Sequence, residues 1–499
     1  MRCSALFLLA TALSARAGDP ITDQFRAFLG DLKGRWAAET HSESRTVLIK
    51  EFRRFDHSEA VAWLVAEVVT KETAADVVRE ALRILGGYKN LAAVAEIIES
   101  YDRKLKDREQ KAHFLPVLGR LTGEESQKRI EQAFKQSDAR MLIGACDAAG
   151  IRKLPEFRPL VVALLKHRTM QVRVAALQAL LAMRAEEALP EIFQLFCAET
   201  SNRVRYEAWC ALTSLVRDTT LPYDPAAWKE WHTQRVAEVP AGQPNPWGTF
   251  PSIQGTPAQP AWFFGIPVFA DRICFVIDTS GDMNNGWAVD LYAEREKKEP
   301  EQIPGFFSVK TRWLLARNHI RRCLELLPES TEVAFVFFNK EIQTYPEDRV
   351  RYLKNSSGTR DRIFRFLDDE VKRTATTDMY DAFKAAWGFL GSGNADKNFS
   401  SGCDTILFVT DGLPADGEMK HRPDRLRDEV WKATFLPRIR VHTVGLHNHA
   451  YELLKNAAKD SGGLYVHAQE AGDEAEPQDL EFWPAKKKAF EEARKAKKS

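Results

Sequence analysis

The chain has 499 residues, of which 44% are hydrophobic and 28% charged, and its formal net charge is +1. This length exceeds what a single hydrophobic core usually supports, and the composition excludes wholesale disorder, so we expect at least two folded domains. The near-neutral charge gives no electrostatic attraction toward a polyanion, and nucleic acid is therefore not an expected ligand.

The first seventeen residues have the features of an export signal. Arg2 gives a basic start, residues 5–13 are apolar, and the small-x-small triplet at 15–17 precedes Gly18. A buried N-terminal helix is the alternative, but the flanks of the run match the export pattern. No later stretch reaches the ~20 apolar residues of a membrane helix. The sequence therefore predicts an exported protein without a transmembrane segment, located in the periplasm, at the cell surface or outside the cell.

Residues 22–236 have the pattern of helices that stack in pairs. The segments VREALRIL, RVAALQALL and RYEAWCALTSL repeat small and apolar positions about thirty-two residues apart, or a multiple of that. Because a lone helical hairpin exposes its apolar face, such repeats stack into a solenoid. With Arg173 and Arg205 near the helix starts, these segments resemble HEAT repeats, an all-α family. An irregular helical bundle is the alternative.

A short helix is expected to close this region. Asp224 followed by Pro225 is typical of a helix start, and Trp228 and Trp231 then lie three residues apart on one face. We expect the two rings to pack against the open end of the solenoid. The alternative, in which two exposed tryptophans form a surface that binds a ligand, is the less economical interpretation. Residues 237–262, rich in Pro, Gly and Gln, follow as a linker.

The second domain, predicted at residues 263–470, alternates strands and helices. Short, continuous apolar strands separated by amphipathic helices indicate a doubly wound parallel sheet, Rossmann-like, with both faces covered. The expected strands are at 273–277, 333–338, 405–409, 440–444 and 464–467, and the expected helices are at 311–327, 360–371, 380–390 and 424–435. Residues 471–499 form a charged tail.

Three oxygen-rich segments follow strands or precede a helix of this sheet. They are DTSGD at 278–282, TTD at 376–378 and TDG at 410–412. Ligands of an open parallel sheet bind beyond the carboxyl ends of its strands, so we expect the three segments to converge there. Hydroxyls and carboxylates without histidine or thiolate suit magnesium, manganese or calcium and exclude a typical zinc site.

These motifs carry a family resemblance. FVIDTSGDM, TTDMYDAF, ILFVTDGLP and VHTVGLHNHAYELLKNAAKDSGGLYV resemble, in order, the signatures of von Willebrand factor type A (VWA) domains. The resemblance implies a metal-ion-dependent adhesion site (MIDAS) formed by Asp278, Ser280, Thr377 and Asp411. It also implies that an acidic side chain of a partner protein completes the shell of the ion, with magnesium the first choice.

The sequence departs from the family pattern at Asp282, where a second serine is expected. We include Asp282 among the predicted metal ligands. With Asp278, Asp282 and Asp411 ionised, three negative charges face a doubly charged ion, which favours metal binding and disfavours an incoming carboxylate. A vestigial site without an ion is the alternative. The polar insertion at 284–310 leaves the first loop directly and is either a specificity loop or an excursion without a role.

The leading hypothesis is a non-enzymatic, cation-dependent protein-binding or adhesion module on a helical scaffold, of unknown oligomeric state. No set of catalytic residues is recognisable in the sequence. His447 and His449 are expected to face solvent, because no cysteine or carboxylate lies at the spacing of a metal site beside them. Two alternatives remain. One is a metal-free VWA scaffold, and the other is an RNA-binding protein resembling the Ro family, which also joins HEAT-like repeats to a VWA domain.

Overall fold

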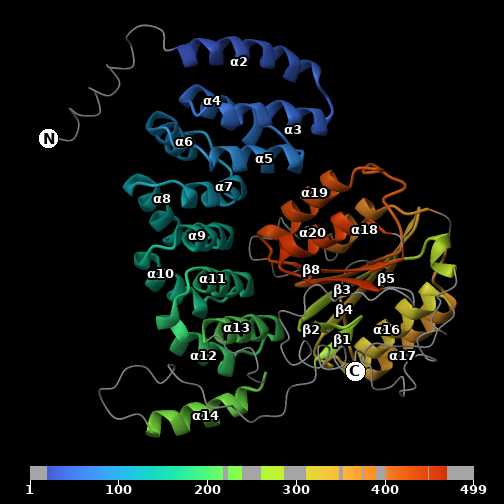
Figure 1. Ribbon diagram of the computed structural model, residues 1–499. Coiled ribbons are helices and arrows are strands. Elements are labelled where there is room, and N and C mark those ends of the chain that lie inside the picture. Colours follow the sequence, from blue (N-terminus) through green and yellow to red (C-terminus); the bar gives the residue numbers. More distant parts are fainter. Residues whose placement is uncertain are drawn as a thin grey trace, which may run out of the picture. The chain divides into compact units, whose positions relative to one another are not determined.

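The computed structural model describes residues 20–216, 223–238, 260–285, 311–347, 352–373, 376–388, 399, 402–447 and 449–468. The chain divides into two compact units, Met1–Lys106 and Asp107–Ser499. Their helices and strands are labelled in Figure 1. The predicted export signal, the tail, most of the linker and the insertion from residue 286 onward lie outside the described residues.

Within residues 20–106 the first unit consists of helices joined by short turns. Phe52 is fully buried at its centre and stacks on Trp63, with ring centroids 5.1 Å apart. Asn90 begins the last helix of this unit by accepting hydrogen bonds from the amides of Ala92 and Ala93, which are unpaired at a helix start. The helices are α2 (Pro20–Ala38), α3 (Ser42–Lys50), α4 (Ser58–Trp63), α5 (Ala75–Leu85) and α6 (Leu91–Arg103), with a 3₁₀ turn at Glu51–Arg54 and a π turn at Leu64–Val69.

The second unit begins with further helices that recur at a regular spacing. They are α7 (Arg108–Arg120), α8 (Glu124–Phe134), α9 (Ala139–Arg152), α10 (Arg158–Ala163), α11 (Met170–Ala182), α12 (Leu189–Ala198), α13 (Asn202–Leu215) and α14 (Pro225–Glu238). Because α7, α9, α11 and α13 begin at 108, 139, 170 and 202, every second helix starts 31 or 32 residues after the previous one. This spacing agrees with the repeat read from the sequence.

Close packing between α7 and α9 depends on glycine. A Cβ atom on Gly144 would lie 2.5 Å from the carbonyl oxygen of Ala112, and one on Gly119 would lie 2.7 Å from the carbonyl oxygen of Ala148. Both separations are shorter than van der Waals contact, so the two backbones can approach this closely only where a side chain is missing on one of them.

The closing helix forms as expected. Asp224 accepts hydrogen bonds from the amides of Ala226 and Ala227 at the start of α14. Trp228 is fully buried and Trp231 nearly so, and the ring of Trp228 lies 5.8 Å from that of Phe196 in α12. The two tryptophans therefore cover the preceding helices, as predicted from their spacing.

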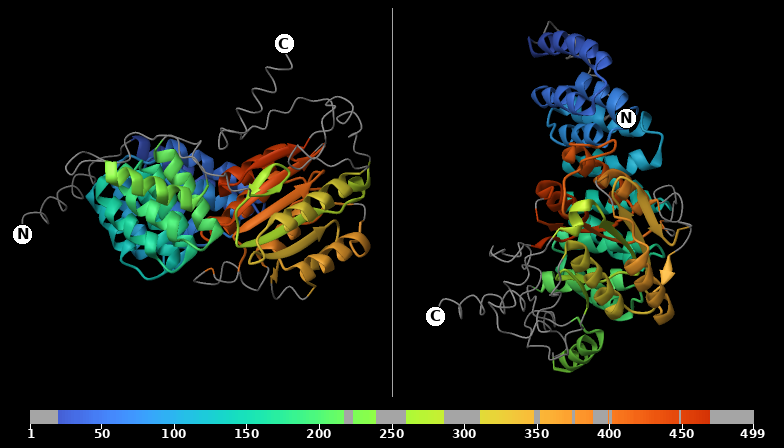
Figure 2. Two further views of the ribbon diagram at one scale, coloured as in Figure 1. Left: turned by 90° about the horizontal axis from the view of Figure 1, so that it is seen from below. Right: turned by 90° about the vertical axis from the view of Figure 1, so that its right-hand side faces the viewer.

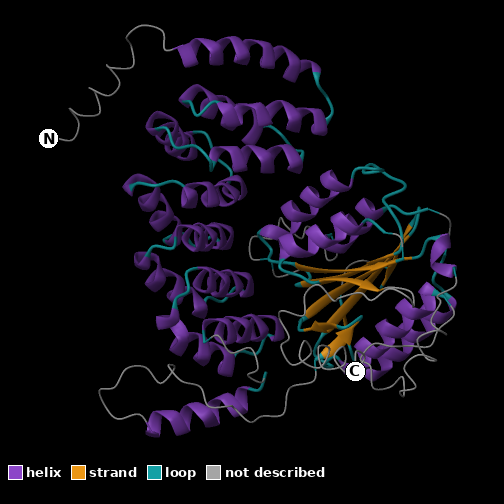
Figure 3. Ribbon diagram, viewed as in Figure 1, coloured by secondary structure: helices purple, strands orange, loops and turns teal. Residues whose placement is uncertain are grey.

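The remainder of the second unit is a mixed sheet with strand order β5-β4-β3-β7-β8-β9, in which β6 also pairs with β4. Figure 3 shows the strands surrounded by helices. The strands are β3 (Arg272–Asp278), β4 (Glu332–Phe338), β5 (Ile342–Tyr345), β6 (Leu353–Lys354), β7 (Thr405–Thr410), β8 (Arg440–Leu446) and β9 (Tyr465–Ala468). A separate hairpin of β1 (Ala261–Phe263) and β2 (Ile266–Val268) precedes them.

Both faces of the sheet are buried, which explains the continuous apolar runs. Successive residues of a strand point to opposite faces, and in β3 Ile273, Phe275 and Ile277 join one core while Cys274 and Val276 join the other. Figures 1 and 2 show helices on both faces of the sheet. The first core contains α16 (Arg312–Leu326) and α17 (Ser357–Asp369), and the second contains α18 (Met379–Trp387), α19 (Pro423–Phe435) and α20 (Tyr451–Ser461).

The predicted fold class, a helical region followed by an α/β sheet domain, is confirmed. The sheet is nevertheless mixed, because β5 and β6 pair antiparallel with β4. These short strands and the β1–β2 hairpin were missing from the predicted elements, since a strand of two to four residues gives little periodicity to recognise. The helix α20 was also missing from the predicted elements. Among the described residues, no helix is long and apolar enough to cross a membrane.

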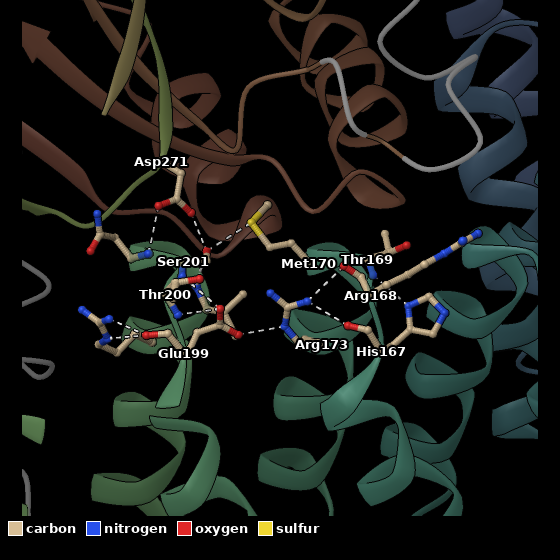
Figure 4. Close-up of polar contacts among 12 residues, drawn as sticks. His167, Arg168, Thr169, Met170, Arg173, Glu199, Thr200, Ser201 and Asp271 are labelled. Atoms are coloured by element: carbon tan, nitrogen blue, oxygen red, sulfur yellow. Dashed lines mark hydrogen bonds and ion pairs between the residues drawn. The ribbon is translucent and has the colours of Figure 1, made fainter. Parts of the chain in front are cut away.

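Within the second unit, Asp271 joins the helices to the sheet. Its carboxylate, just before β3, accepts hydrogen bonds from the hydroxyl of Ser201 and from the amide of Asn202 at 2.9 Å (Figure 4). An acidic group at a helix N-terminus is favourable because the first amides are unpaired and the helix dipole is positive there. Asp271 thus caps α13 together with Ser201, whose hydroxyl also accepts from the amide of Val204.

A buried charge network lies beside this cap. The Glu207 carboxylate of α13 pairs with Arg203 in the same helix and with Arg440 at the start of β8. Burial favours a higher pKa for Glu207, but the charges of Arg440 and Arg203 outweigh it and hold the pKa below its usual value. Asp271 and Arg440 both stand at the amino ends of their strands, so the helices contact this end of the sheet.

Ser201→Ala is expected to lower the free energy of unfolding by about 1–2 kcal/mol, because it removes both a helix cap and a hydrogen bond to Asp271. Chemical denaturation of the full chain measures this loss. Thr311→Ala is the matched control, since the Thr311 hydroxyl accepts from the Leu314 amide at the start of α16. A loss no larger than that of Thr311→Ala would show that the contact with Asp271 adds nothing.

Candidate metal site at the carboxyl ends of the strands

The candidate site is formed where three strands end at one edge of the sheet. β3 runs parallel to both β4 and β7, so these strands finish together at Asp278, Phe338 and Thr410. The Thr279 amide after β3 donates to the carbonyl of Phe338, and the Asp378 amide donates to the carbonyl of Asn339, just beyond β4. These bonds bring the first two oxygen-rich segments to the same edge.

Asp278 is fully buried and is held by hydrogen bonds at both carboxylate oxygens. Its Oδ1 accepts from the amide of Ser280 at 2.8 Å, and its Oδ2 accepts from the hydroxyl of Thr410 at 2.6 Å. Burial, followed by the neighbouring charge of Asp411, raises the pKa of Asp278 to about 7. A nearby cation would therefore stabilise its ionised form.

Asp411 follows β7 and faces the first segment. The hydroxyl of Ser280 lies 3.4 Å from its Oδ1, and the guanidinium of Arg312 lies 2.8 Å from its Oδ2. Burial raises the pKa of Asp411, and Arg312 opposes that increase. Asp278, Ser280 and Asp411, three of the predicted ligands, are thus brought together in a buried position.

Thr377, from the second segment, lies beside the third. Its carbonyl accepts hydrogen bonds from the amides of Ala415 and Asp416, both at 3.1 Å, so the loop after Asp411 wraps around it. A Cβ atom placed on Gly412 would lie 3.5 Å from the Thr377 hydroxyl. The hydroxyl therefore faces the backbone next to Asp411. The Asp378 carboxylate caps α18 by accepting from the amide of Asp381.

Asp282 does not join the buried set. Its side chain is exposed and accepts a hydrogen bond from the Asn285 side chain at 3.1 Å, although its charge still contributes to the raised pKa of Asp411. Across the described part of the chain, no three His, Cys, Asp or Glu side chains come together as a metal-binding group. The role of Asp282 as a ligand therefore stays a prediction.

Arg312 is the residue of this site that sequence analysis missed. It is the first residue of α16 and is only 5% exposed. Besides its ion pair with Asp411, its guanidinium lies 3.3 Å from the carbonyl oxygen of Asp282. In the sequence it follows the long insertion and belongs to none of the recognised motifs, so only its proximity in the structure relates it to the site.

The residues fit a hard divalent cation. Ser280 joins two buried carboxylates, because its amide bonds Asp278 and its hydroxyl lies 3.4 Å from Oδ1 of Asp411. The Thr377 hydroxyl faces the backbone next to Asp411. Magnesium, manganese and calcium prefer such oxygen donors. With two carboxylates and two neutral hydroxyls, the charge of a doubly charged ion would be balanced.

One of the two histidines near this edge differs from expectation, because His449 is 7% exposed and so does not face solvent. Its ring packs on Gly445, where a Cβ atom would lie 2.1 Å from Nε2, and Nε2 is 2.7 Å from the hydroxyl of Tyr465. Nδ1 lies 2.9 Å from the carbonyl of His447, a residue that is exposed as expected. Burial lowers the pKa of His449 to about 4, so the ring is neutral at pH 7.

The sheet domain has a doubly wound α/β fold, with helices covering both faces of the sheet. Among solved structures the chain is similar to a protein described as von Willebrand factor type A from Catenulispora acidiphila, with 14% identity and a TM-score of 0.29. The match covers 44% of this chain and 42% of that chain, less than half of either. No protein-family profile and no curated protein sequence matches.

Proposed function

We propose that this protein is an exported module that binds another protein through a divalent cation held in a MIDAS-like site. Asp278, Ser280, Thr377 and Asp411 would hold the ion, with Asp282 as a further candidate, and magnesium, manganese and calcium all suit these oxygen donors. When bound, the cation would supply an open coordination position for an acidic side chain of the partner. Export is inferred from the sequence of residues 1–17 alone.

The observation that carries this proposal is the buried pair of carboxylates with adjacent hydroxyls at the carboxyl ends of the strands. The helices of the second unit contact the sheet through Asp271 and Arg440, which stand at the opposite, amino ends. This division suits a scaffold that holds the domain at one end and presents the site at the other. Leu413, two residues after Asp411, is 52% exposed and offers an apolar contact beside the ion.

Binding fits the site better than catalysis. A buried imidazole next to the third loop belongs to His449, and the following amide, of Ala450, donates to the carbonyl of Gly412. Both ring nitrogens of His449 have partners within the domain, so this histidine is not poised as a general base. We therefore assign no reaction to the site.

Titration of magnesium, manganese and calcium into the metal-stripped full chain tests the proposal. Calorimetry is expected to show saturable binding by the parent and a loss of more than about 100-fold in affinity for Asp411→Ala, which removes a direct ligand. Asp416→Asn is the matched control. It removes a charge five residues further along the same loop, where the side chain bonds Gly417 and Thr376, and its affinity should stay close to that of the parent.

The ion pair between Arg312 and Asp411 favours a second candidate, a VWA-like scaffold that works without metal. The same titration separates the two. Equal binding by the parent and Asp411→Ala, or no binding by either, would refute the metal-dependent function and leave the metal-free scaffold.

A further inference from the structure

Arg312 connects three parts of the candidate site. Its backbone amide donates to the carbonyl of Asn285 at 3.4 Å, and its guanidinium contacts the carboxylate of Asp411 and the carbonyl of Asp282. Its position is set locally, because Thr311 caps α16 and Arg312 is the next residue. The start of α16 therefore carries a positive charge to the carboxylate at the end of β7.

The guanidinium changes the charge balance on which metal binding depends. Without it, the carboxylates of Asp278 and Asp411 would be compensated by a divalent ion alone. With it, Asp411 already has a cationic partner at 2.8 Å, and this partner is nearly as buried as the carboxylate itself. A cation bound at either oxygen of Asp411 would lie within about 4–6 Å of this guanidinium, where like charges repel strongly because burial limits screening.

The two oxygens of Asp411 also face different neighbours. Oδ1 points toward the hydroxyl of Ser280, and Oδ2 is bonded to Arg312. An ion coordinated by Oδ2 must displace the guanidinium of Arg312, and an ion coordinated by Oδ1 must bind beside that guanidinium. In both cases Arg312 reduces the affinity for the ion.

We propose that Arg312 is a built-in cation of this site, which competes with the divalent ion for Asp411 and sets the metal affinity. This inference rests on the proposed metal-dependent function and adds a residue that controls it. It also accounts for Asp282, because the extra negative charge at that position is balanced by the extra positive charge of Arg312. The guanidinium nitrogen that bonds Oδ2 of Asp411 also contacts the carbonyl of Asp282, so an ion that displaces it from Oδ2 would couple metal binding to the loop that follows Ser280.

The experiment compares magnesium and manganese affinity of the full chain with that of four variants. Arg312→Gln and Arg312→Met remove the charge and should bind each ion at least about tenfold more tightly. Arg312→Lys keeps the charge and should stay within about threefold of the parent. Arg373→Gln is the matched control, because the guanidinium of Arg373 bonds the side chain of Asn284 in the same loop at 2.9 Å, and its affinity should not change.

A second readout follows the arginine itself. The Nε–H signal of Arg312, assigned by its loss in Arg312→Lys, should shift in the parent as magnesium is added and should not shift in Asp411→Ala. This measurement needs no variant that removes the charge of Arg312, so it decides the question even if Arg312→Gln and Arg312→Met fail to fold.

The outcomes separate the inference from the proposed function. Saturable binding by the parent and tighter binding by Arg312→Gln support the inference. If Arg312→Gln binds metal with the same affinity as the parent or more weakly, and Asp411→Ala does not bind metal, the inference is overturned and the metal-dependent function remains. If neither the parent nor Arg312→Gln binds metal, both are overturned. An unshifted Nε–H signal at saturating magnesium also overturns the inference.

Discussion

Glu207→Ala should lower the free energy of unfolding of the second unit by about 3–5 kcal/mol, because it leaves two buried guanidinium groups without their carboxylate. Glu207 pairs with Arg203 and Arg440, and all three side chains are at most 9% exposed. The lost attraction is accompanied by repulsion between the two arginines. Since Arg440 belongs to β8 and Arg203 to α13, the variant should loosen the contact between the helices and the sheet. Urea denaturation, with hydrogen exchange of the α13 and β8 amides, measures both effects.

Glu187→Ala is the matched control for this network. Glu187 is 52% exposed and pairs with Arg158 on the surface, so its removal should cost less than about 1 kcal/mol. Replacing Arg203, Glu207 and Arg440 together by apolar residues of similar size should recover most of the stability lost in Glu207→Ala, because no uncompensated charge remains. Equal losses in Glu207→Ala and Glu187→Ala would contradict the assignment of a buried network.

His113→Phe should gain about 2 kcal/mol of stability relative to the parent when the pH falls from 7.5 to 5. His113 lies in α7 with its ring 5.1 Å from that of Phe435 and 5.5 Å from that of Trp431, both in α19. Its two ring nitrogens are buried and lack a hydrogen-bond partner among the described residues. Burial, followed by the charge of Lys432, lowers the pKa of His113 to about 3.

The sign of this effect follows from proton uptake. The unfolded chain binds a proton at His113 near pH 6.5, whereas the folded chain does so only near pH 3. The stability contributed by the neutral ring is complete above pH 6.5 and is lost as the pH falls toward 3. Phenylalanine keeps the aromatic contacts and removes this loss.

The pH dependence of the parent alone would not isolate this histidine. Burial raises the pKa of Asp278 to about 7 and that of Asp404 to about 6, and both carboxyls bind protons more readily in the folded chain, which opposes the loss at His113. Because the parent and His113→Phe share both aspartates, their difference removes these contributions. Replacing the exposed His41 by alanine serves as the control. A constant difference between the parent and His113→Phe from pH 7.5 to 5 would show that His113 is not buried in solution.

Much of the candidate site could be predicted because its residues stand at strand ends. The apolar runs ending at Ile277 and Val409 are continuous, which indicates strands buried on both faces, and parallel strands place their following residues at one edge. Asp278 and Asp411 are therefore neighbours by a general rule, although they are far apart in the sequence. The pairing of Thr410 with Asp278 was not predicted, because a hydroxyl inside a strand could face either way.

The sequence by itself determined the alternation of helices and strands, the repeat of every second helix, the closing tryptophans and the converging oxygen-rich loops, since each depends on local periodicity or on residues next to a strand end. Tertiary structure decided the partners of the charged and titratable side chains. Arg312 reaches Asp411 across 99 positions, and Arg440 reaches Glu207 across 233, only because α16 and α13 pack where they do. His449 is buried because Gly445 leaves room for its ring. The local sequence pattern determines on which helix or strand a side chain lies and which face it occupies. Tertiary packing determines which other residues it contacts.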